Sequence, residues 1–166
     1  MIMKKILLLI LVILCFGVSA CSKNTDMKGI KNLNEQKIFE QKEDKYYVFF
    51  YRDGCSGCED TKPYILAYIK ALKSGNYEGA RQIYGVNLSS GNNYLMYVTN
   101  KTSGGQGTDE RFWVDGVTNW EDLKIGSTPS LITIYLKEGV KVAQYAGQGK
   151  EKIIDILNEQ LVTHKK

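Results

Sequence analysis

The chain has 166 residues, a formal net charge of +4, one histidine and four cysteines. Its lysines and glutamates are interspersed, without a basic stripe or a nucleic-acid-reading motif, so we expect no nucleic-acid partner. The histidine, His164, lies in a lysine-rich tail, and a second C-x-x-C pair is missing, so the four ligands of a closed zinc site are not at hand. We therefore predict neither a metal nor another cofactor.

Residues 1–20 are typical of a secretory signal. Two lysines precede an uncharged apolar run over residues 6–18, which is short for a membrane span. The run ends in Val-Ser-Ala-Cys at residues 18–21, which resembles the bacterial lipobox. That resemblance implies cleavage before Cys21 and a lipid anchor on its sulfur, with two acyl chains for stable attachment. An uncleaved anchor helix or an ordinary signal cleaved near Ala20 are the alternatives, and all three export the rest of the chain.

The remainder of the chain has the size of one domain. Residues 22–34 are polar, rich in lysine and asparagine, and lack apolar periodicity, which predicts a flexible tether. We therefore expect a lipoprotein signal peptide over residues 1–20, a tether over residues 21–34 and a folded domain over residues 35–166.

Cys55 and Cys58 are the only cysteines expected in the folded domain, because Cys15 lies in the signal peptide and Cys21 is assigned to the lipid. A disulfide across so short a loop removes little unfolded-state entropy, which makes a purely structural role weak. With a zinc site disfavoured as well, redox chemistry is the remaining role for the pair.

The pair lies between a predicted strand and a predicted helix. Residues 46–51 are continuously apolar, aromatic and β-branched, as in a strand that is buried on both faces. A turn signal, Arg-Asp-Gly, follows at residues 52–54, and apolar residues then recur at helical spacing through Lys73. A cysteine at a helix start meets unpaired N–H groups and the positive end of the helix dipole, which lower its thiol pKa. Cys55 is then the nucleophile and Cys58 the resolving thiol.

This strand, C-x-x-C and helix resemble the active site of the thioredoxin superfamily. A proline five residues after the second cysteine is frequent in that family, and Pro63 occupies this place. A first-turn helix proline is the alternative for Pro63. The resemblance spans about residues 38–161 and implies an α/β thioredoxin fold, in which helices flank a central mixed sheet.

The C-terminal half follows the same family order. Residues 80–88 fit a strand, and the segment 119–125 a short helix or turn. A strand, a hairpin turn, a second strand and a helix then follow at residues 131–136, 137–140, 141–146 and 150–161. The resemblance implies that Pro129 is cis and faces the cysteines, and that the backbone of Thr128 pairs with a substrate chain. A trans proline that opens an edge strand is the alternative.

The chain departs from the family at two positions close to the cysteines. Thioredoxins usually have tryptophan before the first cysteine and a buried aspartate six residues before it, where this chain has Gly54 and Phe49. The group that deprotonates Cys58 is therefore open, with water, Glu59 and Asp60 as candidates.

An insertion over about residues 89–118 precedes the proline loop. Its centre, residues 100–109, is rich in Gly, Thr and Ser and is expected to be a mobile loop, while residues 94–98 and 112–114 are expected to form an extra hairpin or helix. Functionally, the insertion either covers the site and selects substrates or packs on the sheet edge. A lipoprotein with such an insertion also resembles the bacteriocin-transport accessory proteins.

The sequence thus predicts an enzyme, a thiol–disulfide oxidoreductase anchored on the extracytoplasmic face of the cell membrane, whose partners are exported proteins with cysteines or disulfides. The direction is open. A helix-start thiolate favours oxidation of clients, whereas Thr128 resembles the isomerase and reductase branches, which would need a membrane electron donor. The alternatives are a non-enzymatic thioredoxin-fold chaperone or bacteriocin or secretion accessory protein, and a reductase for heme or copper maturation.

Overall fold

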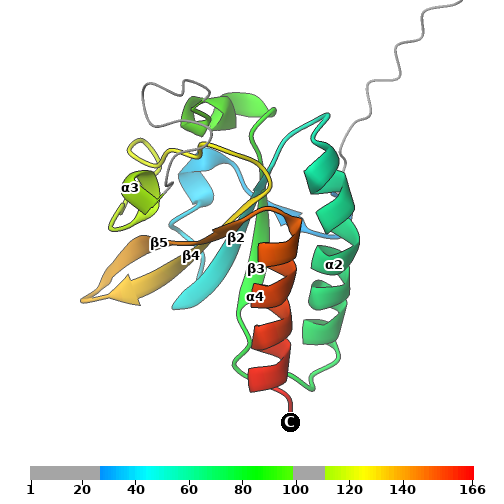
Figure 1. The fold of residues 1–166 in the computed structure, drawn as a ribbon. Coiled ribbons are helices and arrows are strands. Elements are labelled where there is room, and N and C mark those ends of the chain that lie inside the picture. The colour runs from blue at the N-terminus through cyan, green and yellow to red at the C-terminus, as the bar shows by residue number, and fades with distance from the viewer. Residues whose placement is uncertain (1–26, 99–110) are drawn as a thin grey trace, which may run out of the picture.

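The structure, a computed structural model, describes residues 27–98 and 111–166 and contains a five-stranded sheet with the order β1-β3-β2-β4-β5 (Figure 1). In chain order its elements are β1 (Lys31–Asn32), the 3₁₀ helix η1 (Glu35–Lys37), β2 (Lys45–Tyr51), α2 (Ser56–Lys73), β3 (Gln82–Asn87), the 3₁₀ helix η2 (Gly91–Met96), α3 (Arg111–Val114), β4 (Ser130–Lys137), β5 (Val140–Gln148) and α4 (Lys150–Thr163). The predicted signal peptide, the anchor Cys21 and the centre of the insertion lie outside the described residues. No helix among those described is both long enough and apolar enough to cross a membrane.

The sheet is mixed, as predicted. β1 and β2 both pair in parallel with β3, whereas β4 runs antiparallel to β2, and β5 antiparallel to β4. The parallel strands are joined by α2, which forms the crossover between β2 and β3. The two antiparallel strands form the predicted hairpin.

The central strand β2 is buried on both faces, which confirms the interpretation of its continuous apolar run. Alternate side chains point to opposite sides of a strand. One set packs beneath α2 and α4, and the other packs on the opposite face of the sheet. The first set is Tyr47, Phe49 and Tyr51, and the second is Tyr46, Val48 and Phe50, and none of the six is more than 2% exposed.

The two faces of the sheet are covered by different kinds of structure (Figure 1). On one, which we call the helical face, α2 and α4 pack side by side. The other, the irregular face, is covered by short helices and loops whose buried apolar side chains include Ile38, Met96, Val114, Leu123 and Ile125. Both faces therefore carry a packed apolar core.

The prediction of a flexible tether over residues 21–34 is wrong from residue 27 onward. Met27, Ile30 and Leu33 are buried, and β1 between the last two pairs with β3. Met27 and Ile30 pack in one core and Leu33 in the other. β1 itself has only two residues, too few to show the alternation that predicts a strand. Residues 21–26 lie outside the described part of the chain.

The described flanks of the insertion pack against the sheet as short helices rather than as a hairpin. The chain after η2 is held to the segment before the proline loop, since Ile125 N–H donates to Met96 O at 2.8 Å and Val98 N–H donates to Ile125 O at 3.0 Å. After α3, residues 115–117 run along the outer edge of β5: Gly116 N–H donates to Ala143 O at 3.0 Å, and Ala143 N–H donates to the carbonyl of residue 117 at 2.7 Å. The segment 119–125 forms turns.

Candidate redox site

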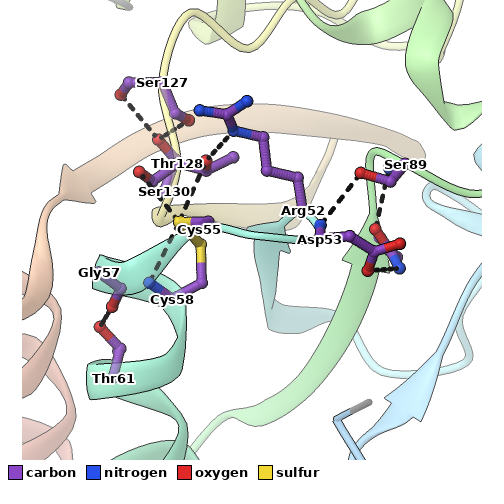
Figure 2. The surroundings of a disulfide bond; sticks show 11 residues. Arg52, Asp53, Cys55, Gly57, Cys58, Thr61, Ser89, Ser127, Thr128 and Ser130 are labelled. Carbon is purple, nitrogen blue, oxygen red and sulfur yellow. Dashed lines mark hydrogen bonds between the residues drawn. A yellow bond between two sulfur atoms is a disulfide. The ribbon is translucent and has the colours of Figure 1, made fainter. Parts of the chain in front are cut away.

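Cys55 lies at the N-cap of α2 and forms a disulfide with Cys58, which is one turn into the helix (Figure 2). The Sγ atom of Cys55 accepts a hydrogen bond from Cys58 N–H at 3.1 Å, and the Cys55 carbonyl accepts from Glu59 N–H at 3.1 Å. The sulfur therefore lies at the positive end of an 18-residue helix, where Cys58 N–H is shared between the sulfur and the carbonyl of Cys55. The strand-to-helix placement predicted for the pair is confirmed.

The two sulfurs differ in accessibility. Cys55 is 7% exposed and Cys58 is fully buried. Beside them is a pocket of about 300 Å³, lined by Gly54, Ser56, Glu59 and Asp60. Of the two sulfurs, only that of Cys55 can thus be approached by a second molecule. Its exposure is small because the loop that precedes β4 lies against it.

That loop contains the Thr128-Pro129 peptide bond, which is cis. Thr128 lies 73 residues after Cys55 in the chain, yet its carbonyl oxygen is 3.6 Å and its hydroxyl oxygen 3.5 Å from Cys55 Sγ. The loop is held on its other side by Gly149 N–H, which donates to Pro129 O at 2.9 Å. The predicted juxtaposition of the proline loop and the cysteines is present, and the alternative of a trans proline is wrong.

Gly57 explains why the loop can approach so closely. A Cβ atom at this position would lie 3.1 Å from Pro129 Cδ, which is tighter than an ordinary van der Waals contact. The small residue between the cysteines therefore leaves room for the proline ring above the first turn of α2.

Pro63 lies inside α2 rather than in its first turn, which excludes the alternative of an N-terminal helix proline. Because proline has no N–H, the carbonyl of Glu59 loses its usual intrahelical donor. Nearby, Thr61 is buried and its hydroxyl donates to Gly57 O at 2.6 Å, which secures the first turn below the disulfide.

Two residues at the site escaped sequence inspection. Arg52, which we interpreted only as part of a turn, donates from Nε to Thr128 Oγ1 at 3.2 Å (Figure 2). Its guanidinium carbon lies 5.3 Å from the ring centroid of Tyr97, at the end of the described part of the insertion. No local sequence pattern predicts either contact, because the partners are distant in the chain.

The place of the family's buried aspartate is filled by Phe49, which packs in the same apolar cluster as Cys58. Glu59 and Asp60 lie beside the pocket instead. His164 is at the opposite end of α4 from the disulfide, where its Nδ1 is 2.9 Å from Gln160 O. Among the described residues, no group of three or more His, Cys, Asp or Glu side chains could hold a metal ion.

The mixed sheet, the C-x-x-C pair at a helix start and the opposing cis-proline loop together define the thioredoxin fold, as the sequence predicted. No protein-family model and no curated protein matches the chain.

Among solved structures, the chain is similar to the J-Trx1 fragment of ERdj5, at 18% identity and a TM-score of 0.44 over 82% of this chain and 54% of that one. It is also similar to full-length ERdj5, at 17% identity and a TM-score of 0.40 over 81% of this chain and 14% of that one. The chain thus spans about half of the fragment and a small part of the full-length protein.

Proposed function

We propose that this chain is a thiol–disulfide oxidoreductase that is lipid-anchored on the extracytoplasmic face of the membrane and exchanges disulfides with exported proteins. The observation that carries the proposal is the disulfide of Cys55 and Cys58 at the start of α2, against the cis Thr128-Pro129 loop. A purely structural disulfide needs neither a helix dipole nor an opposing cis-proline loop.

In the reducing direction, the thiolate of Cys55 attacks a client disulfide. A new bond joins Cys55 to one client sulfur, and the electron pair of the broken bond leaves with the other. The sulfur of Cys58 then attacks the sulfur of Cys55, which restores the internal disulfide. The client sulfur that was bound to Cys55 leaves with the electron pair of that bond and takes up the proton that Cys58 releases. The client gains two electrons and the pair loses them. The oxidising direction reverses these steps.

The burial of the two sulfurs supports this division of roles. Cys55 is 7% exposed and lies between two residues that line the pocket, Gly54 and Ser56, whereas Cys58 is fully buried and is bonded to the sulfur of Cys55. The backbone of Thr128 next to Cys55 offers peptide groups with which an extended client segment pairs as an added strand. Thr128 and Pro129 are therefore the proposed substrate-binding residues.

Insulin reduction with dithiothreitol as electron donor tests the activity. The oxidoreductase proposal expects turnover by the parent protein and none by Cys55→Ser, with Ser56→Ala as a matched control that keeps both sulfurs. If the parent protein is inactive but still binds unfolded clients, the thioredoxin-fold chaperone or secretion accessory is the better description.

Client trapping tests the partners. Cys58→Ser leaves Cys55 able to form the mixed disulfide but removes the thiol that resolves it, so clients remain covalently attached. Exported proteins recovered from Cys58→Ser and absent from the Cys55→Ser, Cys58→Ser double variant are the expected result. The redox state of these clients in cells that lack the protein decides between oxidation and reduction, and a membrane electron donor is proposed only for reduction.

The proposed location at the membrane rests on the predicted signal peptide and on Cys21. Mass spectrometry of the mature N-terminus is expected to find a diacylglyceryl group on Cys21, and Cys21→Ser is expected to release the protein from the membrane fraction. A mature chain that begins elsewhere, or that keeps residues 1–20, contradicts the lipoprotein assignment without affecting the redox chemistry.

A further inference from the structure

Arg52 lies in a position from which it acts on the nucleophilic sulfur through another residue. Its Nε–H donates to Thr128 Oγ1 at 3.2 Å, and that oxygen lies 3.5 Å from Cys55 Sγ. The positive charge is thus within two hydrogen-bond lengths of the sulfur (Figure 2). The guanidinium group of arginine is not deprotonated in proteins.

The hydrogen bond from Arg52 fixes what the hydroxyl of Thr128 can do. A hydroxyl group has one hydrogen and accepts through its oxygen lone pairs. Because Arg52 supplies a donor to that oxygen, the hydroxyl hydrogen is left to point at Cys55 Sγ. A donor in such a chain is polarised by the charged group behind it, which strengthens the second hydrogen bond.

The other groups around the sulfur partly oppose one another, so the hydroxyl of Thr128 can shift the balance between thiol and thiolate. Cys58 N–H also favours a negative sulfur, whereas the Thr128 carbonyl at 3.6 Å favours a protonated thiol. Glu59 and Asp60 at the pocket oppose a negative charge as well. Arg52 adds the positive charge of a side chain to that of the helix dipole in this balance.

Among the described residues, the carboxylate next to Arg52 in the chain is directed away from the guanidinium. The carboxylate of Asp53 is turned toward the end of β3, where it accepts from Asn87 Nδ2 at 3.1 Å (Figure 2). Within residues 27–98 and 111–166, Arg52 forms no ion pair with a carboxylate. Residues 126–129, directly before β4, contain a serine and a threonine side chain and no charge.

The guanidinium is held in place from the irregular face. It lies over the ring of Tyr97, 5.3 Å from the centroid, where a planar cation is attracted by the aromatic face. Tyr97 is itself fixed by the short parallel bridge to Ile125, three residues before Thr128. The insertion and the proline loop thus meet at Arg52.

We propose that Arg52 is a positioning residue that stabilises the thiolate of reduced Cys55 by directing the hydroxyl hydrogen of Thr128 at its sulfur, with Tyr97 as its support. The inference rests on the proposed function, because the thiolate is the species that attacks. It predicts that loss of Arg52 makes Cys55 harder to ionise and less reactive at neutral pH.

The test is the pKa of Cys55, obtained from the pH dependence of its alkylation by iodoacetamide, with the modified peptide quantified by mass spectrometry. The protein is the full-length chain in detergent, with Cys15→Ser and Cys21→Ser so that the pair contributes the only thiols. Arg52→Met is expected to raise the pKa of Cys55 by about one unit, and Arg52→Lys by less. Lys70→Met, which removes a charge from the last turn of α2, is the control and is expected to leave the pKa unchanged.

A double-mutant cycle with Thr128→Val separates the relay from a through-space effect. If the hydroxyl carries the effect, Arg52→Met adds much less in the Thr128→Val background than alone. An equal shift in both backgrounds overturns the relay, and an unchanged pKa in Arg52→Met overturns the whole inference. Tyr97→Leu, which leaves Arg52 in place, is expected to give a smaller rise in the pKa and guards against a poorly folded Arg52 variant.

Failure of the inference and failure of the proposed function give different results. Normal insulin reduction by the parent, together with a Cys55 pKa that is unchanged in Arg52→Met, rejects the inference alone. A pKa that responds to Arg52 in a protein without exchange activity rejects the proposed function and leaves the positioning role intact.

Discussion

The two faces of the sheet contribute to the site in different ways. The helical face is built from two long helices, and one of them begins at the disulfide. The irregular face is built from short helices and loops, and it supplies Tyr97, which holds Arg52. The regular layer therefore holds the sulfurs and supplies the backbone donor of Cys58, while the irregular layer supplies the aromatic ring beside Arg52.

The largest effect is expected when one buried core residue is truncated on each face of the sheet. Phe49 packs on the helical face and Phe50 on the irregular face, and both are fully buried. We expect Phe49→Ala and Phe50→Ala each to lower the free energy of unfolding by roughly 3–5 kcal/mol. Urea denaturation of the oxidised protein measures both. A loss below about 1 kcal/mol for Phe50→Ala would show that the irregular face is not a packed core.

The segment that joins the two faces gives the next largest effect. A chain that begins at residue 35 lacks the buried side chains of Met27, Ile30 and Leu33. We expect it to be less stable than a chain that begins at residue 27 by about 2 kcal/mol, since lost apolar burial is partly offset by fewer ordered residues. Equal thermal stability of the two chains would restore the tether originally predicted for these residues.

Gly57→Ala perturbs the contact between the helical face and the proline loop. The added methyl group must displace Pro129, which lies 3.1 Å from its Cβ position. We expect insulin reduction to slow about fivefold, the equivalent of about 1 kcal/mol, with little change in stability. Ser56→Ala, one residue earlier and exposed, is the matched control and should keep the parental rate. A rate equal to that of Ser56→Ala would mean that the close approach is not needed.

The smallest effect concerns alkaline pH. Burial raises the pKa of Tyr46 on the irregular face and of Tyr68 on the helical face above the ordinary value of 10.0. A raised pKa in the folded state stabilises the protein fully below about pH 10, and this contribution is lost as the pH rises further. Their hydroxyls donate to Ile38 O and Arg81 O, each at 2.7 Å.

We expect Tyr46→Phe and Tyr68→Phe each to lower the free energy of unfolding at pH 7 by about 1 kcal/mol, because a buried hydrogen bond is lost. Above about pH 10, stability should fall less steeply in each variant than in the parent. Denaturation curves between about pH 7 and pH 11 measure both slopes. A parental slope in either variant would show that its tyrosine is not the group responsible.

Local patterns were sufficient to predict the regular half of the molecule. The apolar run of β2, the helical spacing after Cys58 and the Thr-Pro dipeptide each carry a signal within a few residues, and together they located both sulfurs and the loop against them. The direction in which each side chain of β2 points also follows from simple alternation.

The rest could not be predicted because it depends on contacts between distant residues. Arg52 precedes the C-x-x-C pair in what reads as a turn, and its partner Thr128 is 76 residues away. The tether was misjudged for a related reason, since isolated apolar residues in a polar segment become core only when β3 lies beside them. Sequence periodicity reports on regular elements, and the irregular face has few.

The segment at residues 115–117 limits strand pairing between the edge of the sheet and other extended chains. An open outer strand invites pairing with any neighbour, including another copy of the same protein. Here the middle of β5 already has its outward N–H and carbonyl at Ala143 satisfied, and at the other border β1 is only two residues long. Within the described residues, both margins of the sheet are therefore poor templates for uncontrolled association, which would favour the cis-proline loop as the place where the proposed clients pair.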